Sequence, residues 1–168
     1  LKLTGKVGKT SFGILGAVDE PFSNNFDKKK AYDGIFRIKR DFGKESNIGF
    51  MATHRSYPER HNTVGGFDWR WKIDKNSEFR GQVLGSTSKA KFYNPDTDGV
   101  DYRIGNAIAY NYNYFKVNGD FTYGFGGSGA TKDYRADLGF NQRTNTNQVY
   151  GFLEYNSKPK PKEFIIQK

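Results

Sequence analysis

The chain of 168 residues contains no cysteine, which excludes disulfide bonds, thiolate metal sites and a cysteine nucleophile. It also lacks any run of 18 apolar residues, so no segment fits a transmembrane helix. Branched aliphatic residues are scarce, since 6 Leu, 9 Ile and 7 Val stand against 15 Phe, 11 Tyr and 2 Trp. Soluble cores normally rely on branched aliphatic side chains. The composition therefore argues against an ordinary soluble core, although the length suits one domain.

The net charge is +9, from 27 Lys and Arg against 18 Asp and Glu. Such an excess suits an acidic partner, for example nucleic acid, anionic lipid headgroups or an anionic glycan. Charge alone does not distinguish these partners, so the placement of the charges along the chain has to decide.

Apolar and charged residues alternate strictly from Phe67 to Asp74, within the stretch Val64 to Asp74. Phe67, Trp69, Trp71 and Ile73 share one face of an extended strand, whereas Asp68, Arg70 and Lys72 share the other. A period of two residues is typical of a strand that lies between an apolar medium and water. The nature of that apolar medium decides what kind of protein this is.

The same pattern recurs along most of the chain and predicts ten strands, with the start of another near residue 163. The predicted strands cover residues 1–8, 10–19, 32–41, 46–56, 63–74, 78–88, 101–117, 120–127, 133–140 and 147–156. Short and long connections alternate between them, and 57–62, 89–100 and 126–132 are expected to be longer loops. This alternation predicts an up-and-down antiparallel meander with tight turns at one rim, as in outer-membrane barrels.

The charged face cannot point into lipid, because one Arg or Lys at the bilayer midplane costs about 2–4 kcal/mol. We therefore expect charged side chains to face a polar lumen and contact solute: Arg37, Lys39, Arg55, Asp68, Arg70, Lys72, Arg80, Arg103 and Arg135. Aromatic side chains are expected to form a belt in the membrane: Phe67, Trp69, Trp71, Tyr110, Tyr112, Tyr114, Phe121, Tyr123 and Phe125. Ala136, Leu138 and Phe140 are assigned to the same outward face.

Two alternative interpretations remain open. In the first, the chain is a soluble β-barrel binding module whose aromatic residues fill the core and whose positive charge attracts an anionic polymer or glycan. In the second, it is a scaffold or subunit of a larger envelope complex. Neighbouring chains paired with the terminal strands would select the second.

No constellation in the sequence predicts an enzyme, a metal site or a cofactor. Asp96, Asp98 and Asp101 resemble a calcium loop but lack its closing bidentate acid, so we interpret them as a solvated turn. His54 and His61 have no further ligands at metal-binding spacing. The basic runs at 28–30 and 158–162 are solvated loops that could meet lipopolysaccharide phosphates at a rim.

Three segments resemble one known family. They are Lys2 to Ala17, then Phe36 to Asp41 followed by Ser46 to Phe50 and Arg55, and finally Asp133 to Thr144. Together they resemble the barrel portion of a family of large bacterial outer-membrane proteins, which carry an amino-terminal carbohydrate-binding domain similar to family nine. The resemblance implies an internal segment of such a barrel, since that carbohydrate-binding domain is not visible here.

The sequence thus predicts an all-β fold, an antiparallel up-and-down transmembrane β-barrel of the outer-membrane type. Residues 1–168 would form either a single barrel domain or an internal segment of a larger barrel. We expect a location in the bacterial outer membrane and a role in solute- or glycan-related transport, or as an envelope scaffold. The expected partners are outer-membrane lipid and lipopolysaccharide, a glycan or other small solute, and other envelope chains, but not nucleic acid.

Overall fold

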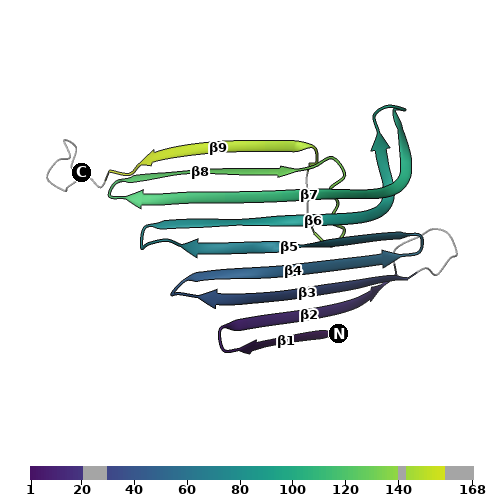
Figure 1. The fold of residues 1–168 in the computed structure, drawn as a ribbon, viewed down its shortest axis with the longest axis horizontal. Coiled ribbons are helices and arrows are strands. Elements are labelled where there is room, and N and C mark those ends of the chain that lie inside the picture. Colours follow the sequence, from purple (N-terminus) through teal and green to yellow (C-terminus); the bar gives the residue numbers. More distant parts are fainter. Residues whose placement is uncertain (21–29, 140–142, 158–168) are drawn as a thin grey trace, which may run out of the picture.

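The structure is a computed structural model that describes residues 1–20, 30–139 and 143–157. Nine β-strands make up its regular secondary structure (Figure 1). The strands are β1 (Lys2–Val7), β2 (Thr10–Asp19), β3 (Ala31–Phe42), β4 (Ser46–Tyr57), β5 (Arg60–Lys72), β6 (Ser77–Asn94), β7 (Gly99–Asn118), β8 (Phe121–Ala130) and β9 (Thr146–Tyr155). Within the described ranges, no helix has the length and hydrophobicity needed to cross a membrane.

All nine strands belong to one antiparallel sheet, in which each strand pairs with its neighbours in the sequence. The order is β1 to β9 without a crossover, so the predicted up-and-down meander is confirmed. The sheet is open in this chain, because β1 and β9 form two edges and do not pair with each other. The prediction of ten strands was wrong by one.

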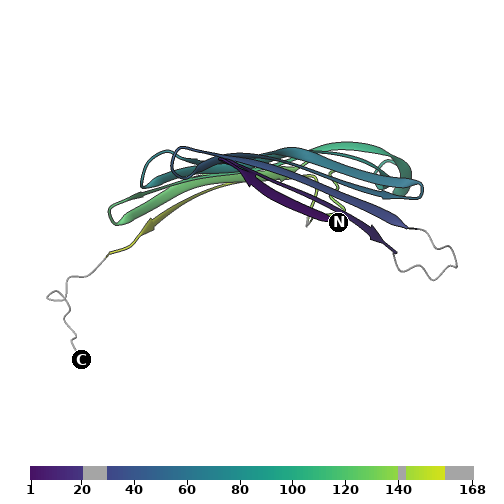
Figure 2. The same ribbon diagram turned by 90° about the horizontal axis from the view of Figure 1, so that it is seen from below.

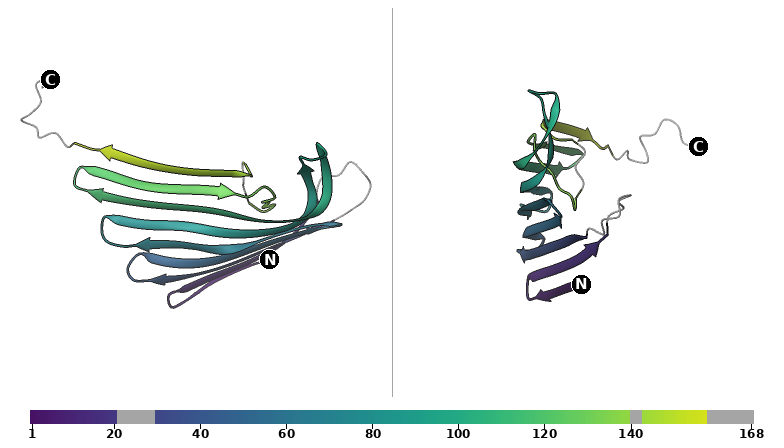
Figure 3. Two further views of the ribbon diagram at one scale, coloured as in Figure 1. Left: turned by 45° about the horizontal axis from the view of Figure 1, so that its top comes forward. Right: turned by 90° about the vertical axis from the view of Figure 1, so that its right-hand side faces the viewer.

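The sheet is curved, and Figure 2 shows it bent into an arch. In the end-on view of Figure 3 (right), both edge strands curve toward the same side. The segment 131–139, which follows β8, lies on this concave side. We call this segment the inward segment and the two sides of the sheet the concave and the convex face.

Every pair of neighbouring strands keeps one unbroken register, so side chains stay on their face across the whole sheet. On the concave face, Asp68 is opposite Gln82, Gln82 is opposite Asn111, and Asn111 is opposite Ser128. Because directly paired residues of antiparallel strands point to the same side, this row shows that the concave face is polar. Lys39, Arg55 and the other charged positions predicted on strands fall on the same face.

Tight turns occupy one rim, as predicted. They lie at Gly8–Lys9, 43–45, 73–76 and Gly119–Asp120, and Gly8, Gly43 and Gly119 have the positive φ angles that such turns favour. The opposite rim differs from the prediction. The β4–β5 connection is only Pro58–Glu59, with Glu59 at a φ of 69°. β6 and β7 extend to Pro95–Asp98 and bend away from the other strands (Figure 1).

The strand predicted over 133–140 is wrong. Asp133 to Gly139 form no strand. Phe140, residues 28–29 and 158–162 of the basic runs and the segment near 163 lie outside the described residues, whereas Lys30 is exposed and forms an ion pair with Glu20 at 3.7 Å. The alternation in this stretch has another cause, because Tyr134 and Ala136 pack on the concave face rather than facing outward. The outward assignment of Ala136 is therefore wrong, and Leu138 belongs to no strand.

Gly66 marks a close approach of β5 and β6 and yields a prediction. A Cβ atom at Gly66 would overlap the Val83 carbonyl oxygen and lie 2.8 Å from Leu84 Cα. We expect Gly66→Ala to lower the free energy of unfolding by about 1–3 kcal/mol, because the neighbouring backbone must move. Denaturant titration would measure this loss. Gly65→Ala is the matched control, since its Cβ would lie 3.8 Å from the nearest atom, an ordinary contact.

Candidate functional site

A buried asparagine of β5 holds the inward segment on the concave face. Asn62 is 1% exposed, and its Nδ2 donates hydrogen bonds to Ser88 Oγ (2.7 Å) and to the Arg135 carbonyl oxygen (2.8 Å). Its Oδ1 accepts a hydrogen bond from the Asp137 backbone N–H (2.9 Å). The Ser86 hydroxyl accepts the Arg135 backbone N–H at 3.4 Å. Asn62 therefore holds the backbone of the inward segment at Arg135 and Asp137 through its own buried amide.

An ion pair and a small apolar cluster anchor the beginning of the inward segment. Arg103 of β7 donates two hydrogen bonds to the Asp133 carboxylate, at 2.7 and 2.8 Å. Tyr134 is 7% exposed and packs with Ala107 and Ala130. Burial raises the pKa of the Tyr134 hydroxyl above its ordinary value. The inward segment is thus fixed by polar and apolar contacts to four strands, β5 to β8.

Ion pairs cover much of the remaining concave face. Arg37 forms two hydrogen bonds with Asp68, one of them at 2.8 Å. Arg70 binds Glu78 at 2.8 and 2.9 Å, and Glu78 is only 3% exposed. The first pair joins β3 to β5 across Gly49 of β4, and the second joins the adjacent strands β5 and β6. Both neutralise charges that would otherwise be costly to crowd together. The arginine side chains of this polar surface are therefore held in place by their carboxylate partners.

A shallow polar groove crosses β6 to β9 beside the inward segment. It has a volume of about 780 Å³. Its lining includes Gln82, Asn111, Ser128 and Gln148, which are directly paired across the strands. Amide and hydroxyl groups both donate and accept hydrogen bonds, and Arg143 also lines the groove, so this groove suits a polar group of a solute.

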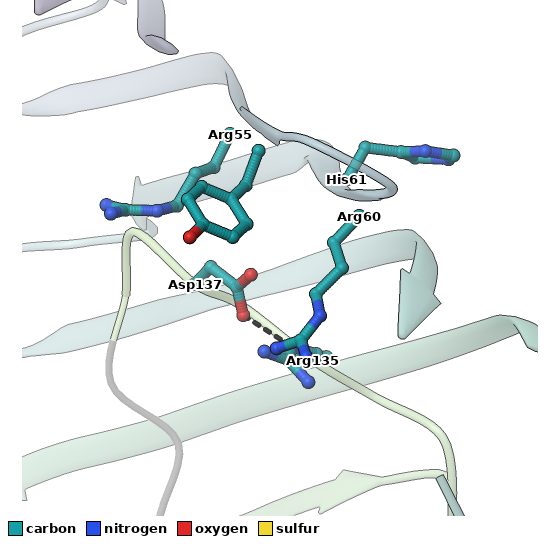
Figure 4. A pocket seen from close by; sticks show the side chains of 6 residues that line it. Arg55, Arg60, His61, Arg135 and Asp137 are labelled. Atoms are coloured by element: carbon teal, nitrogen blue, oxygen red, sulfur yellow. Dashed lines mark hydrogen bonds and ion pairs between the residues drawn. The ribbon is translucent and has the colours of Figure 1, made fainter. Parts of the chain in front are cut away.

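A smaller cavity of about 280 Å³ lies between the inward segment and the β4–β5 hairpin (Figure 4). Three arginines dominate its lining, and Arg60 extends toward Arg135. Arg55 binds Asp19 (2.9 Å) and Asp33 (3.2 Å), whereas Arg135 Nε binds Asp137 (2.5 Å). The full lining is Arg55, Tyr57, Arg60, His61, Arg135 and Asp137. The ring of His61 points away from the arginines.

The convex face is aromatic and uncovered. Trp71, Phe79, Tyr114 and Phe125 form one continuous row across β5 to β8, close to the rim of tight turns. Tyr114 and Phe125 pack with their ring centroids 5.4 Å apart. The structure places all nine residues of the predicted aromatic belt on this face: Phe67, Trp69, Trp71, Tyr110, Tyr112, Tyr114, Phe121, Tyr123 and Phe125. Their contact with lipid stays a prediction.

The charged residues predicted to face a lumen also share one side of the sheet. Arg37, Lys39, Arg55, Asp68, Arg70, Lys72, Arg80 and Arg103 lie on strands of the concave face, and Arg135 reaches it from the inward segment. The structure brings Arg55 and Arg135 to one cavity. Their contact with a solute stays a prediction.

Sequence reasoning missed the residues that position the inward segment. Asn62 lies one residue before the predicted strand 63–74, and extending its alternation backward would have placed Asn62 on the charged face. No local pattern could have revealed its partners, because Arg135 and Asp137 are 73 and 75 residues away. Arg60 falls within the longer loop predicted over 57–62, whereas the structure places it at the start of β5, directly after the two-residue connection Pro58–Glu59.

The arrangement suits binding of a polar solute. Guanidinium groups, amides and hydroxyls converge on one concave surface, and they recognise charged and hydrogen-bonding groups without forming covalent bonds. Among the described residues, no group of three His, Asp or Glu side chains could hold a metal ion.

Comparison with known proteins gives one family. A family model described as a domain of unknown function (DUF5916) matches residues 20–167. The comparisons with curated proteins and with solved structures found no match.

Proposed function

The chain belongs to the DUF5916 family, and from this premise we propose that it forms part of an outer-membrane β-barrel with a polar lumen. Its convex face would contact hydrocarbon, and its concave face would line a passage or binding channel for a polar solute or a glycan. The proposal places the protein in the bacterial outer membrane, with lipid and lipopolysaccharide as partners. If the lumen does not admit a solute, the same geometry would suit a role as an envelope scaffold.

The uncovered apolar convex face is the observation that carries this proposal. Phe67 is 56% exposed, Ile108 55% and Leu153 73%, although all three are large apolar residues. Soluble monomers rarely expose a contiguous apolar patch larger than a few hundred Å², and here such residues occur on all nine strands. We propose that the hydrocarbon core of a membrane is the medium that this apolar face contacts.

The length and charge of the strands support the same orientation. β2 to β9 each have at least 10 residues, and about 9–11 tilted residues cross a bilayer as a strand. The concave arginines would each cost about 2–4 kcal/mol if they faced the bilayer midplane. Only one face of this sheet therefore suits lipid.

The two edges of the sheet suit incorporation into a larger barrel. Unpaired N–H and C=O groups are not tolerated in hydrocarbon, so a spanning sheet must close. All ten residues of β9 are exposed, and we propose that β1 and β9 pair with further strands. Such strands would come from the same protein or from a neighbouring envelope chain.

Flotation with liposomes tests the proposal. The intact protein is refolded from urea into preformed phospholipid vesicles and centrifuged through a density gradient at high salt and alkaline pH. We expect it to float with the vesicles and to resist added protease, because a closed barrel buries its strands in lipid.

A monodisperse protein that stays soluble without detergent and does not float would contradict the membrane proposal. Steeply salt-dependent retention of that soluble form on heparin would instead support a soluble module that binds an anionic polymer, since phosphate or sulfate contacts are screened by salt.

A further inference from the structure

We propose that the cavity between the β4–β5 hairpin and the inward segment binds the oxyanion of a small solute that also carries hydroxyl groups. This inference deepens the proposed function by naming the class of solute. It rests on the proposed function in one respect, that the concave face is a lumen which solutes can enter.

One guanidinium of the cavity has no carboxylate partner among the described residues. Three arginines and one aspartate line it. Arg55 is neutralised by two carboxylates, and Arg135 is paired with Asp137. Arg60 is exposed and forms no ion pair with any residue that the structure describes. Arg60 is therefore the guanidinium to which a negatively charged group can bind in this cavity.

The hydrogen-bond donors that remain free come from two different parts of the chain. Arg55 uses both of its terminal nitrogens on Asp33 and Asp19. Arg135 uses its Nε on Asp137, so its terminal N–H groups can bind a ligand, and Arg60 contributes a second guanidinium. Planar guanidinium groups bind carboxylate and phosphate oxygens in pairs. Two of them beside one cavity favour an oxyanion over a neutral group.

The position of Arg135 is preorganised by buried residues. Its carbonyl oxygen accepts from Asn62, and its N–H donates to Ser86. Asn62 and Ser86 are both buried, with 1% and 6% exposure. A binding group whose backbone is already fixed loses less entropy when the ligand arrives.

Size and acceptors narrow the class of ligand further. The volume of about 280 Å³ lies near the lower end of the range for small-molecule sites, about 300–1,000 Å³. The Asp137 carboxylate has one oxygen, Oδ2, that is not used by Arg135. It can accept a hydrogen bond from a hydroxyl group and would repel a second anion. A monosaccharide-sized hydroxy acid fits these requirements.

Titration calorimetry with matched probes tests the inference. Glucuronate, glucose and inorganic phosphate are each titrated into the intact protein in detergent at low ionic strength. We expect glucuronate to bind more tightly than glucose, from which it differs by one carboxylate. Phosphate should bind as well, and more weakly than glucuronate, because it offers fewer hydroxyl groups to Asp137.

Variants then assign the binding to the cavity. Arg60→Gln and Arg135→Gln should each weaken glucuronate binding about tenfold or more, as expected for loss of a charge-assisted hydrogen bond. Asp137→Asn should strengthen phosphate binding, because it removes a repelling charge. Arg80→Gln is the control, since Arg80 lies on the same face but outside this cavity. The circular dichroism spectrum of each variant should match that of the parent protein.

Several results would overturn the inference: equal binding of glucose and glucuronate, no binding of any anion, or a loss in Arg80→Gln as large as in Arg60→Gln. Flotation of the same preparations separates this inference from the barrel proposal. A protein that floats without binding anions contradicts only the cavity. One that binds anions but does not float contradicts only the barrel.

Discussion

Phe67→Arg is expected to lower the free energy of unfolding in phospholipid vesicles by about 2–4 kcal/mol, the cost of an arginine near the centre of a bilayer. Phe67 lies near the middle of β5 on the convex face, and 56% of its surface is exposed. On a water-exposed surface the same substitution would change stability by about 0.5 kcal/mol or less. Urea titration of the vesicle-bound protein, followed by tryptophan fluorescence, would measure the difference.

Two controls separate the charge from other effects of Phe67→Arg. The Phe67 and Phe50 rings pack with centroids 5.1 Å apart, and Phe67→Ala measures the loss of that contact without a charge. Gln82→Arg places the same charge on the concave face, opposite Asp68, and should leave stability nearly unchanged. A loss in Phe67→Arg no greater than in Phe67→Ala would argue that the convex face does not contact hydrocarbon.

Asn62→Ala is expected to release the inward segment while leaving the sheet intact. The substitution removes two hydrogen bonds to the segment, at Arg135 and Asp137, each worth about 1 kcal/mol; the third bond of Asn62, to Ser88, lies within the sheet. A loss of about 2 kcal/mol corresponds to an equilibrium constant for local opening that is about thirtyfold larger. Hydrogen exchange of the backbone amides over residues 131–139, resolved by mass spectrometry, would detect this change.

The control for Asn62→Ala is Asn47→Ala. Asn47 lies on the concave face of β4, opposite Arg70, and makes no side-chain hydrogen bond to another described residue. Its replacement should leave exchange in the inward segment unchanged. In planar bilayers, Asn62→Ala should also raise the conductance of the reconstituted protein, because the segment no longer narrows the lumen. Unchanged hydrogen exchange in Asn62→Ala would show that other contacts, such as the Arg103–Asp133 pair, are sufficient to hold the inward segment in place.

The alternation of side chains was sufficient to predict the meander and its two faces. In β5, a charged and an aromatic residue follow each other from Phe67 to Lys72, and every one of them lies on the predicted side. Such a pattern is local, because neighbouring side chains on a strand point in opposite directions. The register is free of bulges, so a correct assignment on one strand carries across to the next.

The inward segment shows where the same reasoning fails. Asp133 to Gly139 alternate as a strand would, but Arg103 binds Asp133 from β7 and Asn62 binds the backbone from β5. Those partners depend on the curvature of the sheet, which alternation does not reveal. The cavity was missed for the same reason, since Arg60 and Arg135 meet only after the segment has folded back. The side chains that build the candidate site are therefore distant in sequence.

The pairing of each strand with its sequence neighbours has a consequence for the order of assembly. Hairpins can be added one at a time, because each new strand pairs with the strand that precedes it in the sequence. The contacts of Asn62 with the segment span 73 and 75 residues, and they require β5, β6 and β8 to be in place. Docking of the segment is therefore a late folding event, and refolding should regain strand structure before it regains anion binding.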